Sequence, residues 1–172
     1  MSISAQLNGR DGDKLKERRI SMALRKIICI EDELLRKKSR PVEKFDEKLH
    51  KLLDDMAETM RAADGCGLAA PQVGVLRKIV VIETPESGLI ELINPVITES
   101  SGEQEAVEGC LSIPGKSGIT KRPMNVTVEA LDRYGKKRVY HGKDLLARAF
   151  CHEIDHLYGK LYIDIARDIE DY

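Results

Sequence analysis

The feature that most constrains this chain is the segment FCHEIDHLYG, Phe150 to Gly159, in which two histidines stand four residues apart. Residues i and i+4 of an α-helix lie on one face about one turn apart, so His152 and His156 can bind one metal ion together. Glu153 follows the first histidine, and His-Glu-x-x-His on a helix is typical of zinc sites in which the glutamate is the general base. The pattern alone leaves the third ligand open. It also allows a purely structural role, in which both histidines only make hydrogen bonds in the core.

The residues around the two histidines predict a helix from about Asp144 to Tyr158. Leu145 and Ala149 fall on the histidine face of this helix. A neighbouring face carries four further apolar residues: Leu146, Phe150, Ile154 and Leu157. A helix that is apolar over most of its circumference is wrapped by other elements, so the histidines are expected to open into a cleft.

Other segments predict a second helix and several strands. The second helix runs from Asp46 to Ala63, with Asp46 as its N-cap and Gly65 at its end. Strands are predicted at three segments: Lys78–Glu83, Leu89–Ile97 and Asn125–Leu131. The turn DRYG joins the last of these to KKRVYH and predicts a hairpin. We therefore expect an α+β fold with short, mostly antiparallel sheets around a central His-Glu-x-x-His helix.

The composition excludes several classes of function. The net charge is −1, and the chain has two Phe, five Tyr and no Trp, which argues against direct nucleic-acid binding. No apolar run approaches the roughly 20 residues of a membrane span, and the N-terminus lacks a secretory signal. The four cysteines suit a reduced cytoplasmic setting better than a disulfide framework.

The first 21 residues are polar and without periodicity, which predicts a disordered leader before a single catalytic domain at residues 22–172. Met22, where apolar content rises, is a candidate for the true start of the protein.

Two further segments are unusual. GCGLAAPQVG, Gly65 to Gly74, contains small residues that would let a ligand or backbone approach closely, but it lacks the Gly-Lys-Ser/Thr ending of a P-loop. EGCLSIPG, Glu108 to Gly115, places Cys110 before a loop-like Ser-x-Pro-Gly. A cysteine in such a place is more often a small buried apolar residue than a ligand.

Together, the three segments resemble the motifs of the peptide deformylase family, which are Gly-x-Gly-x-Ala-Ala-x-Gln, Glu-Gly-Cys-Leu-Ser and His-Glu-x-Asp-His, in that order. Here they stand at Gly65 to Gln72, Glu108 to Ser112 and His152 to His156. The segment DELLRKKSRPVEKFD is also similar to the N-terminal region of the family. The resemblance extends from about Met22 to the C-terminus.

The resemblance implies a metal-dependent hydrolase that removes the formyl group from the N-terminal formylmethionine of nascent polypeptides. It makes Cys110 the third ligand, beside His152 and His156, of one divalent metal ion. Fe²⁺ is implied in the cell, and Zn²⁺, Ni²⁺ or Co²⁺ can replace it. The implied catalytic groups are Glu153 as general base, with the Gln72 side chain and the Leu111 backbone N–H as donors to the oxyanion.

The resemblance also implies that the substrate lies extended like an added strand between the backbone at Cys66 and at Gly109. The residues expected to bind it are Gly65, Cys66, Gly67, Glu108, Gly109, Leu145 and Ala149. The methionine side chain would enter an apolar pocket near Glu108. The implied partners are nascent formylmethionyl peptides at the ribosome exit of a bacterial-type cytoplasm, and the oligomeric state is not indicated.

Several residues depart from the family motifs or lie outside them. Cys151 stands where most members have Gln, and its side chain should project about 100° away from His152. Cys66 is expected to be buried rather than exposed at the metal. Asp155 is expected to form an ion pair, with Arg122 as a candidate partner. The hydroxyl of Ser112 is expected to fix the ligand loop.

Two other functions were weighed from the sequence. A thermolysin-type metallopeptidase would use the same helix but would take Glu or His downstream of it as third ligand, whereas the EGCLS segment lies upstream. A non-catalytic metal-binding or peptide-binding relative would be favoured by loss of Glu153 or Gln72, and both are present. His50 and His141 match no motif and are expected to be structural or solvated.

Overall fold

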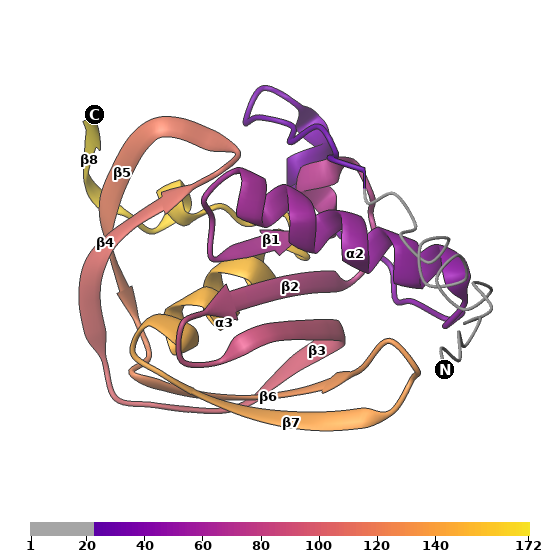
Figure 1. Cartoon of the computed structure of the whole chain (residues 1–172). Helices are drawn as coiled ribbons and strands as arrows, with labels where there is room; N and C mark the ends of the chain where they lie inside the picture. Colours follow the sequence, from indigo (N-terminus) through magenta and orange to yellow (C-terminus); the bar gives the residue numbers. More distant parts are fainter. Residues whose placement is uncertain (1–22) are drawn as a thin grey trace, which may run out of the picture.

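The structure is a computed structural model and describes residues 23–172. Its main elements are two antiparallel sheets and two α-helices (Figure 1). The predicted leader, residues 1–21, lies outside the described residues. The predicted α+β class is confirmed. No helix within the described range is long and apolar enough to cross a membrane.

The larger sheet has five strands in the order β1-β2-β3-β6-β7, and every neighbouring pair is antiparallel. The strands are β1 (Gly67–Ala69), β2 (Ile79–Thr84), β3 (Gly88–Ser101), β6 (Asn125–Leu131) and β7 (Lys137–Lys143). The predicted β6–β7 hairpin is confirmed, and β3 runs four residues beyond the Ile97 boundary predicted for it, to Ser101.

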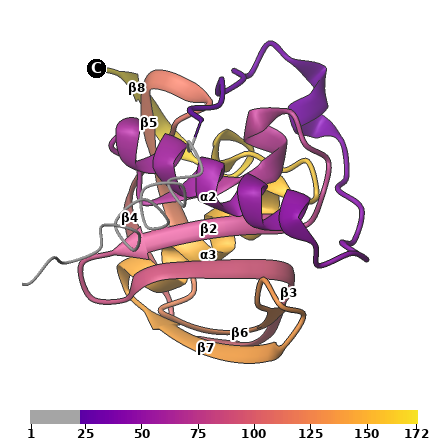
Figure 2. The same ribbon diagram turned by 45° about the vertical axis from the view of Figure 1, so that its right-hand side comes forward.

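The two helices cover opposite faces of this sheet, as Figure 1 and Figure 2 show around β2. Val80 and Ile82 of β2 lie in one core cluster with residues of α3 (Leu145–His156), including Phe150 and Ile154. Alternate residues of the same strand lie in a second cluster with α2 (Glu47–Ala62): Ile79 and Val81, against Leu53, Met56 and Met60. Because successive side chains of a strand point to opposite faces, β2 is buried on both sides, which is why its sequence is a continuous apolar run.

Both predicted helices are confirmed, with small differences at their ends. The Asp46 side chain caps α2 by accepting a hydrogen bond of 3.1 Å from the N–H of Leu49. The helix ends before Gly65: Asp64 adopts the left-handed conformation, with φ of 56°, and the N–H of Gly65 donates to the carbonyl of Met60. Three short 3-10 helices complete the described elements: η1 (Glu33–Arg36), η2 (Ala70–Val73) and η3 (Tyr162–Asp164).

The smaller sheet has the order β4-β5-β8 and was not predicted as strands. Its strands are β4 (Gln104–Cys110), β5 (Ile113–Arg122) and β8 (Arg167–Asp171). The loop-like interpretation of Ser-x-Pro-Gly was wrong, because Ile113 begins β5 and only Leu111 and Ser112 form the turn. Pro114, Gly115 and Gly118 lower the intrinsic strand preference of this segment, so pairing with β4 and β8 decides its conformation.

Candidate active site

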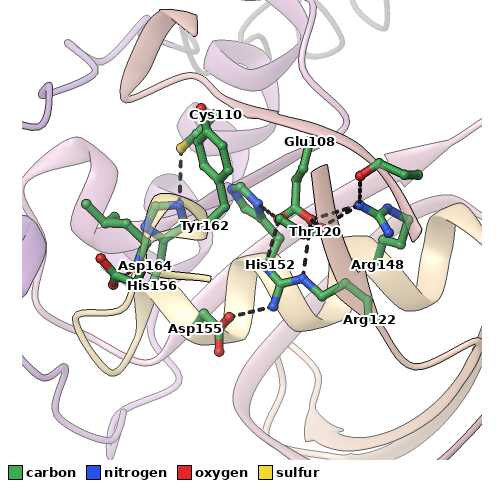
Figure 3. Close-up of polar contacts among 12 residues, drawn as sticks. Glu108, Cys110, Thr120, Arg122, Arg148, His152, Asp155, His156, Tyr162 and Asp164 are labelled. Carbon is green, nitrogen blue, oxygen red and sulfur yellow. Dashed lines mark hydrogen bonds and ion pairs between the residues drawn. The ribbon is translucent and has the colours of Figure 1, made fainter. Parts of the chain in front are cut away.

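A residue of the smaller sheet and two residues of α3 meet at one cluster of donor atoms. The rings of His152 and His156, one turn apart on α3, have centroids 5.1 Å apart. Cys110, at the end of β4, places its Sγ 3.4 Å from Nε2 of His156 (Figure 3). One ligand atom from each of the three residues lies within 4.8 Å of the others. The structure therefore brings together the three residues that were predicted as metal ligands.

The chemistry of this cluster fits a divalent transition metal. Two imidazoles and one thiolate are the donors that such ions prefer, and three protein ligands are typical of catalytic rather than structural sites. Nδ1 of His152 lies 2.5 Å from Glu108, which leaves its Nε2 for the cluster. Burial lowers the pKa of His156 well below its ordinary value and favours the neutral imidazole, the form that binds metal.

Glu108 holds His152 in place from the side opposite the cluster. Its buried carboxylate accepts hydrogen bonds from His152, Arg122 and Arg148, with distances of 2.5, 2.7 and 3.0 Å, and from the hydroxyl of Thr120 (Figure 3). Burial alone would raise the pKa of Glu108, but the hydrogen bonds from His152 and Arg122 hold it well below its ordinary value. The carboxylate thus stays ionised and fixes the orientation of the His152 ring.

Arg122 connects this network to the ligand helix. Its Nη1 lies 2.7 Å from the carboxylate of Asp155, while its Nη2 donates to Glu108. The predicted ion pair between Asp155 and Arg122 is confirmed. Because Arg122 lies on β5 and Asp155 on α3, this ion pair links the two elements. Arg122 is buried and Asp155 is half-buried.

Glu153 is buried beside the histidines and faces the edge of β1. Burial raises the pKa of its carboxyl to about 7. Its Oε2 has no hydrogen-bond partner among residues 23–172. A β-carbon on Gly67 would overlap this carboxylate, so only glycine fits there. Within the first family motif, Gly67 therefore makes room for Glu153.

Residues of η2 and of the turn between β4 and β5 also lie beside the donor cluster. The Gln72 side chain is fixed by the N–H of Ala69, which donates to its Oε1 over 2.9 Å. Its Nε2 donates to the hydroxyl of Ser112 over 3.1 Å and lies 3.6 Å from Sγ of Cys110. Ser112 is fully buried, and its hydroxyl is tied to Gln72, as expected of a residue that fixes the loop. Leu111 is a turn residue between the paired Cys110 and Ile113, so its N–H lies outside the ladder.

A cavity of about 440 Å³ opens onto this cluster. All seven residues predicted to bind substrate line it: Gly65, Cys66, Gly67, Glu108, Gly109, Leu145 and Ala149. Cys66 is exposed toward the cavity, so the expectation of a buried Cys66 was wrong. The reason is that Cys66 directly precedes β1, at the sheet edge that borders the cavity, so its side chain lies outside the core.

Sequence reasoning missed several other residues of the cavity wall. They are Asp64, Val107, Arg148, Pro114, Gly115 and Tyr172. Val107, Pro114 and Gly115 flank the second motif, and extending that motif in both directions would have found them. Arg148 is a charged residue on a predicted helix, which gives no sign that the structure buries it against Glu108. Tyr172 carries no signal in the sequence that connects it with the site.

Three residues set aside by sequence reasoning lie where it expected them. Cys151 belongs to the core cluster of α3 and the large sheet, and burial raises the pKa of its thiol to about 11. His50 contacts the carbonyl of Arg133 over 2.8 Å, and His141 lies 3.1 Å from the Thr127 hydroxyl on an exposed strand.

The chain is similar to known proteins over most of its length. The family model described as polypeptide deformylase matches residues 24–171. A peptide deformylase of Acetivibrio thermocellus is 60% identical over 143 residues, which are 83% of this chain and 84% of that protein. Among solved structures, a peptide deformylase from Legionella pneumophila has a TM-score of 0.82 and 48% identity, and covers 85% of this chain and 88% of its own. The peptide deformylase of Thermotoga maritima has a TM-score of 0.82 and 38% identity, over 84% of this chain and 99% of its own.

Proposed function

Because this chain belongs to the polypeptide deformylase family, we propose that Cys110, His152 and His156 hold the metal ion of its reaction. The protein is a metal-dependent hydrolase that removes the N-formyl group from nascent polypeptides. The observation that carries the assignment of residues is the meeting of these three donor atoms with the buried carboxylate of Glu153 at one cavity.

When held by Cys110, His152 and His156, the ion would supply Lewis-acid chemistry, which would make a water molecule more acidic and ready to attack. One sulfur and two imidazole donors suit Fe²⁺, Zn²⁺, Ni²⁺ or Co²⁺. We propose Fe²⁺ for the enzyme in the cell, as the resemblance to the family implies.

Glu153 acts as general base and then as general acid. It accepts a proton from the attacking water and delivers it to the nitrogen of the amine that leaves, so formate and a free amino terminus are the products. Two features support this role: the carboxylate lines the cavity, and its Oε2 is buried without a partner among the described residues. Gly67 keeps the approach to this carboxylate open.

Gln72 and Leu111 donate hydrogen bonds to the formyl oxygen as negative charge develops on it. The Ala69 N–H fixes the amide of Gln72, so its Nε2 is presented near Cys110 without reorganisation. The N–H of Leu111 is available because the residue lies at the hairpin turn. Each such donor typically stabilises a transition state by about 3 kcal/mol.

The substrate binds as an extended strand between two sheet edges. β1 ends the larger sheet and β4 ends the smaller one, and Cys66, Gly67 and Gly109 from these edges line the cavity. Backbone groups at both edges can pair with a peptide. The methionine side chain would contact Leu145 and Ala149. A formyl group carries hydrogen where an acyl group carries carbon, so close walls beside Cys110 exclude longer acyl chains.

We further propose that the reaction takes place in the cytoplasm, on chains that emerge at the ribosome exit. The activity on nascent polypeptides supports this location.

Formate release from formyl-Met-Ala, measured beside acetyl-Met-Ala, tests the assignment. We expect release only from the formyl peptide, loss of release after chelation, and recovery when Fe²⁺ is returned without oxygen. Release that persists in metal-free protein would contradict the assigned ligands. Cleavage of internal peptide bonds without formate release would instead favour a metallopeptidase.

A further inference from the structure

The rim of the cavity carries exposed apolar side chains that the mechanism above does not use. Val107 on β4 is 68% exposed, and Tyr172 beyond β8 is 83% exposed. Both line the cavity near Gly109: Val107 stands two residues before Gly109 in β4, and the hydroxyl of Tyr172 lies close to Gly109 in space. Large apolar side chains left open at the mouth of a peptide-binding cleft can contact a bound peptide.

The strand β8 brings Tyr172 to this rim. All five residues of β8 are exposed, so the strand adds little to the core. Its pairing with β5 nevertheless fixes the chain: Lys116 pairs with Asp171, and their side chains form an ion pair of 2.6 Å. The N–H of Tyr172 donates to the carbonyl of Gly115 over 3.0 Å. The backbone of Tyr172 is therefore held beside the cleft, while its ring remains largely free.

The ring of Tyr172 lies on one particular face of β4. A β-carbon placed on Gly109 would lie 3.8 Å from the hydroxyl oxygen of Tyr172, so the missing side chain of Gly109 points toward that ring. Val107, two residues earlier in a regular stretch of pairing, shares the face of Gly109. Glu108 points to the other face, toward His152 and Arg148.

If a bound peptide pairs with this edge, as in the proposed function, the two faces of β4 indicate where the side chains of the peptide point. In the proposed function the Leu111 N–H binds the formyl oxygen, so the peptide would run along β4 from Cys110 toward Val107, antiparallel to the strand. Successive side chains alternate, and directly opposed residues share a face with β-carbons about 4.5–5.5 Å apart. The methionine then points to the face of Glu108, and the residue after it points to the face of Gly109.

We propose that Tyr172 is a specificity-determining residue that contacts the side chain following formylmethionine and favours aromatic or large aliphatic side chains there. Because Gly109 has no side chain, the peptide's second side chain can lie over it, between the Tyr172 ring and Val107. Small and polar second residues gain nothing from this contact, so they bind less tightly but react at the same rate once bound.

Formate release from formyl-Met-Phe, formyl-Met-Leu and formyl-Met-Gly by the full chain tests this inference. Tyr172→Ala should lower kcat/KM for the Phe and Leu peptides about three- to tenfold, through KM with kcat unchanged, and should leave formyl-Met-Gly unaffected. Tyr172→Phe should retain the preference, because it keeps the ring.

Tyr134→Ala is the matched control, since Tyr134 is 75% exposed at the turn before β7 and does not line the cavity. It should change none of the ratios. Equal losses on all three peptides, or unchanged ratios in Tyr172→Ala with formate still released, would overturn the role of Tyr172 and leave the proposed function intact. No formate release by the unsubstituted enzyme from any peptide would overturn the proposed function itself, and this inference with it.

Discussion

The proposed active site is made of two halves that differ in how they are held together. The helix half consists of His152, Glu153 and His156 on α3. The hairpin half consists of Glu108, Cys110, Thr120 and Arg122 on β4 and β5. The helix half rests on the main apolar core, where residues such as Phe150 are fully buried against the larger sheet. The hairpin half belongs to the small sheet. Cys110 packs against a small apolar cluster with Ile113, Leu161 and Tyr162, whereas Thr120 and Arg122 are held by hydrogen bonds to the buried carboxylate of Glu108.

Different interactions therefore position the two halves. Apolar burial fixes the position of the two histidines relative to the sheets, because a helix packed on the core cannot shift by a turn without losing its contacts. Charge pairing fixes the approach of the hairpin, because a buried carboxylate is stable only with its partners in place. Substitutions in the two halves should therefore affect metal content, stability and turnover differently.

The largest effect is expected from Cys110→Ala in the hairpin half. The site loses its only anionic ligand, so metal content should fall well below one ion per chain and formate release should fall to assay background. Metal analysis of the purified protein measures this. Cys66→Ala is the control, since Cys66 lines the same cavity but is outside the three-residue donor cluster, and it should keep its metal. A Cys110→Ala protein that retains a full metal content would contradict the assignment of Cys110 as a metal ligand.

Glu153→Gln in the helix half should leave the metal in place and reduce turnover. The change is nearly isosteric and removes only the proton acceptor, and general acid–base catalysis contributes typically about 10²–10⁴-fold. The loss should fall on kcat, with KM little changed. Steady-state kinetics and metal analysis on one preparation check both parts. Near wild-type turnover with full metal content would show that Glu153 is not the base.

Arg122→Met tests whether charge pairing holds the hairpin half. It leaves Glu108 without its closest cationic partner, and breaking a buried pair typically costs about 3–5 kcal/mol. Metal affinity should also fall about 10- to 100-fold, because His152 loses part of the support for its orientation. Denaturant unfolding and a metal competition titration measure the two effects.

Lys121→Met is the matched control for Arg122→Met, because Lys121 is the adjacent residue of β5 and forms an exposed pair with Glu103. It should change neither stability nor metal affinity measurably. Equal effects at the two positions would contradict the view that the buried network supports the ligand.

Asp155→Asn should have the smallest effect, although this residue joins the two halves. Its side chain is 30% exposed, so solvent screens the pair with Arg122, and we expect a loss of about 1 kcal/mol or less in the free energy of unfolding. Turnover should stay within about twofold. Asp168→Asn, in an exposed pair with Arg167, provides the baseline. A loss as large as that of Arg122→Met would show that the two halves are coupled more tightly than their burial indicates.

The helix half could be predicted from the sequence and the hairpin half could not. The i, i+4 spacing of the histidines and the apolar residues around them identify α3 within two residues of its ends. The hairpin contains Pro114, Gly115 and Gly118, which obscure the alternation that marks a strand. Cys110 was assigned as a ligand only through its resemblance to a family motif, because nothing local distinguishes it from a buried apolar cysteine.

The sequence by itself determined the chemical groups of this site and the geometry of α3, on which three of them lie, because helical spacing depends on neighbours about one turn away. Tertiary structure alone decided that Cys110 meets His156 across 46 residues, that Glu108 orients His152, and that β8 brings Tyr172 beside Gly109. These contacts join segments far apart in the chain. They form only when two sheets pack around α3, and no local pattern of residues encodes that arrangement.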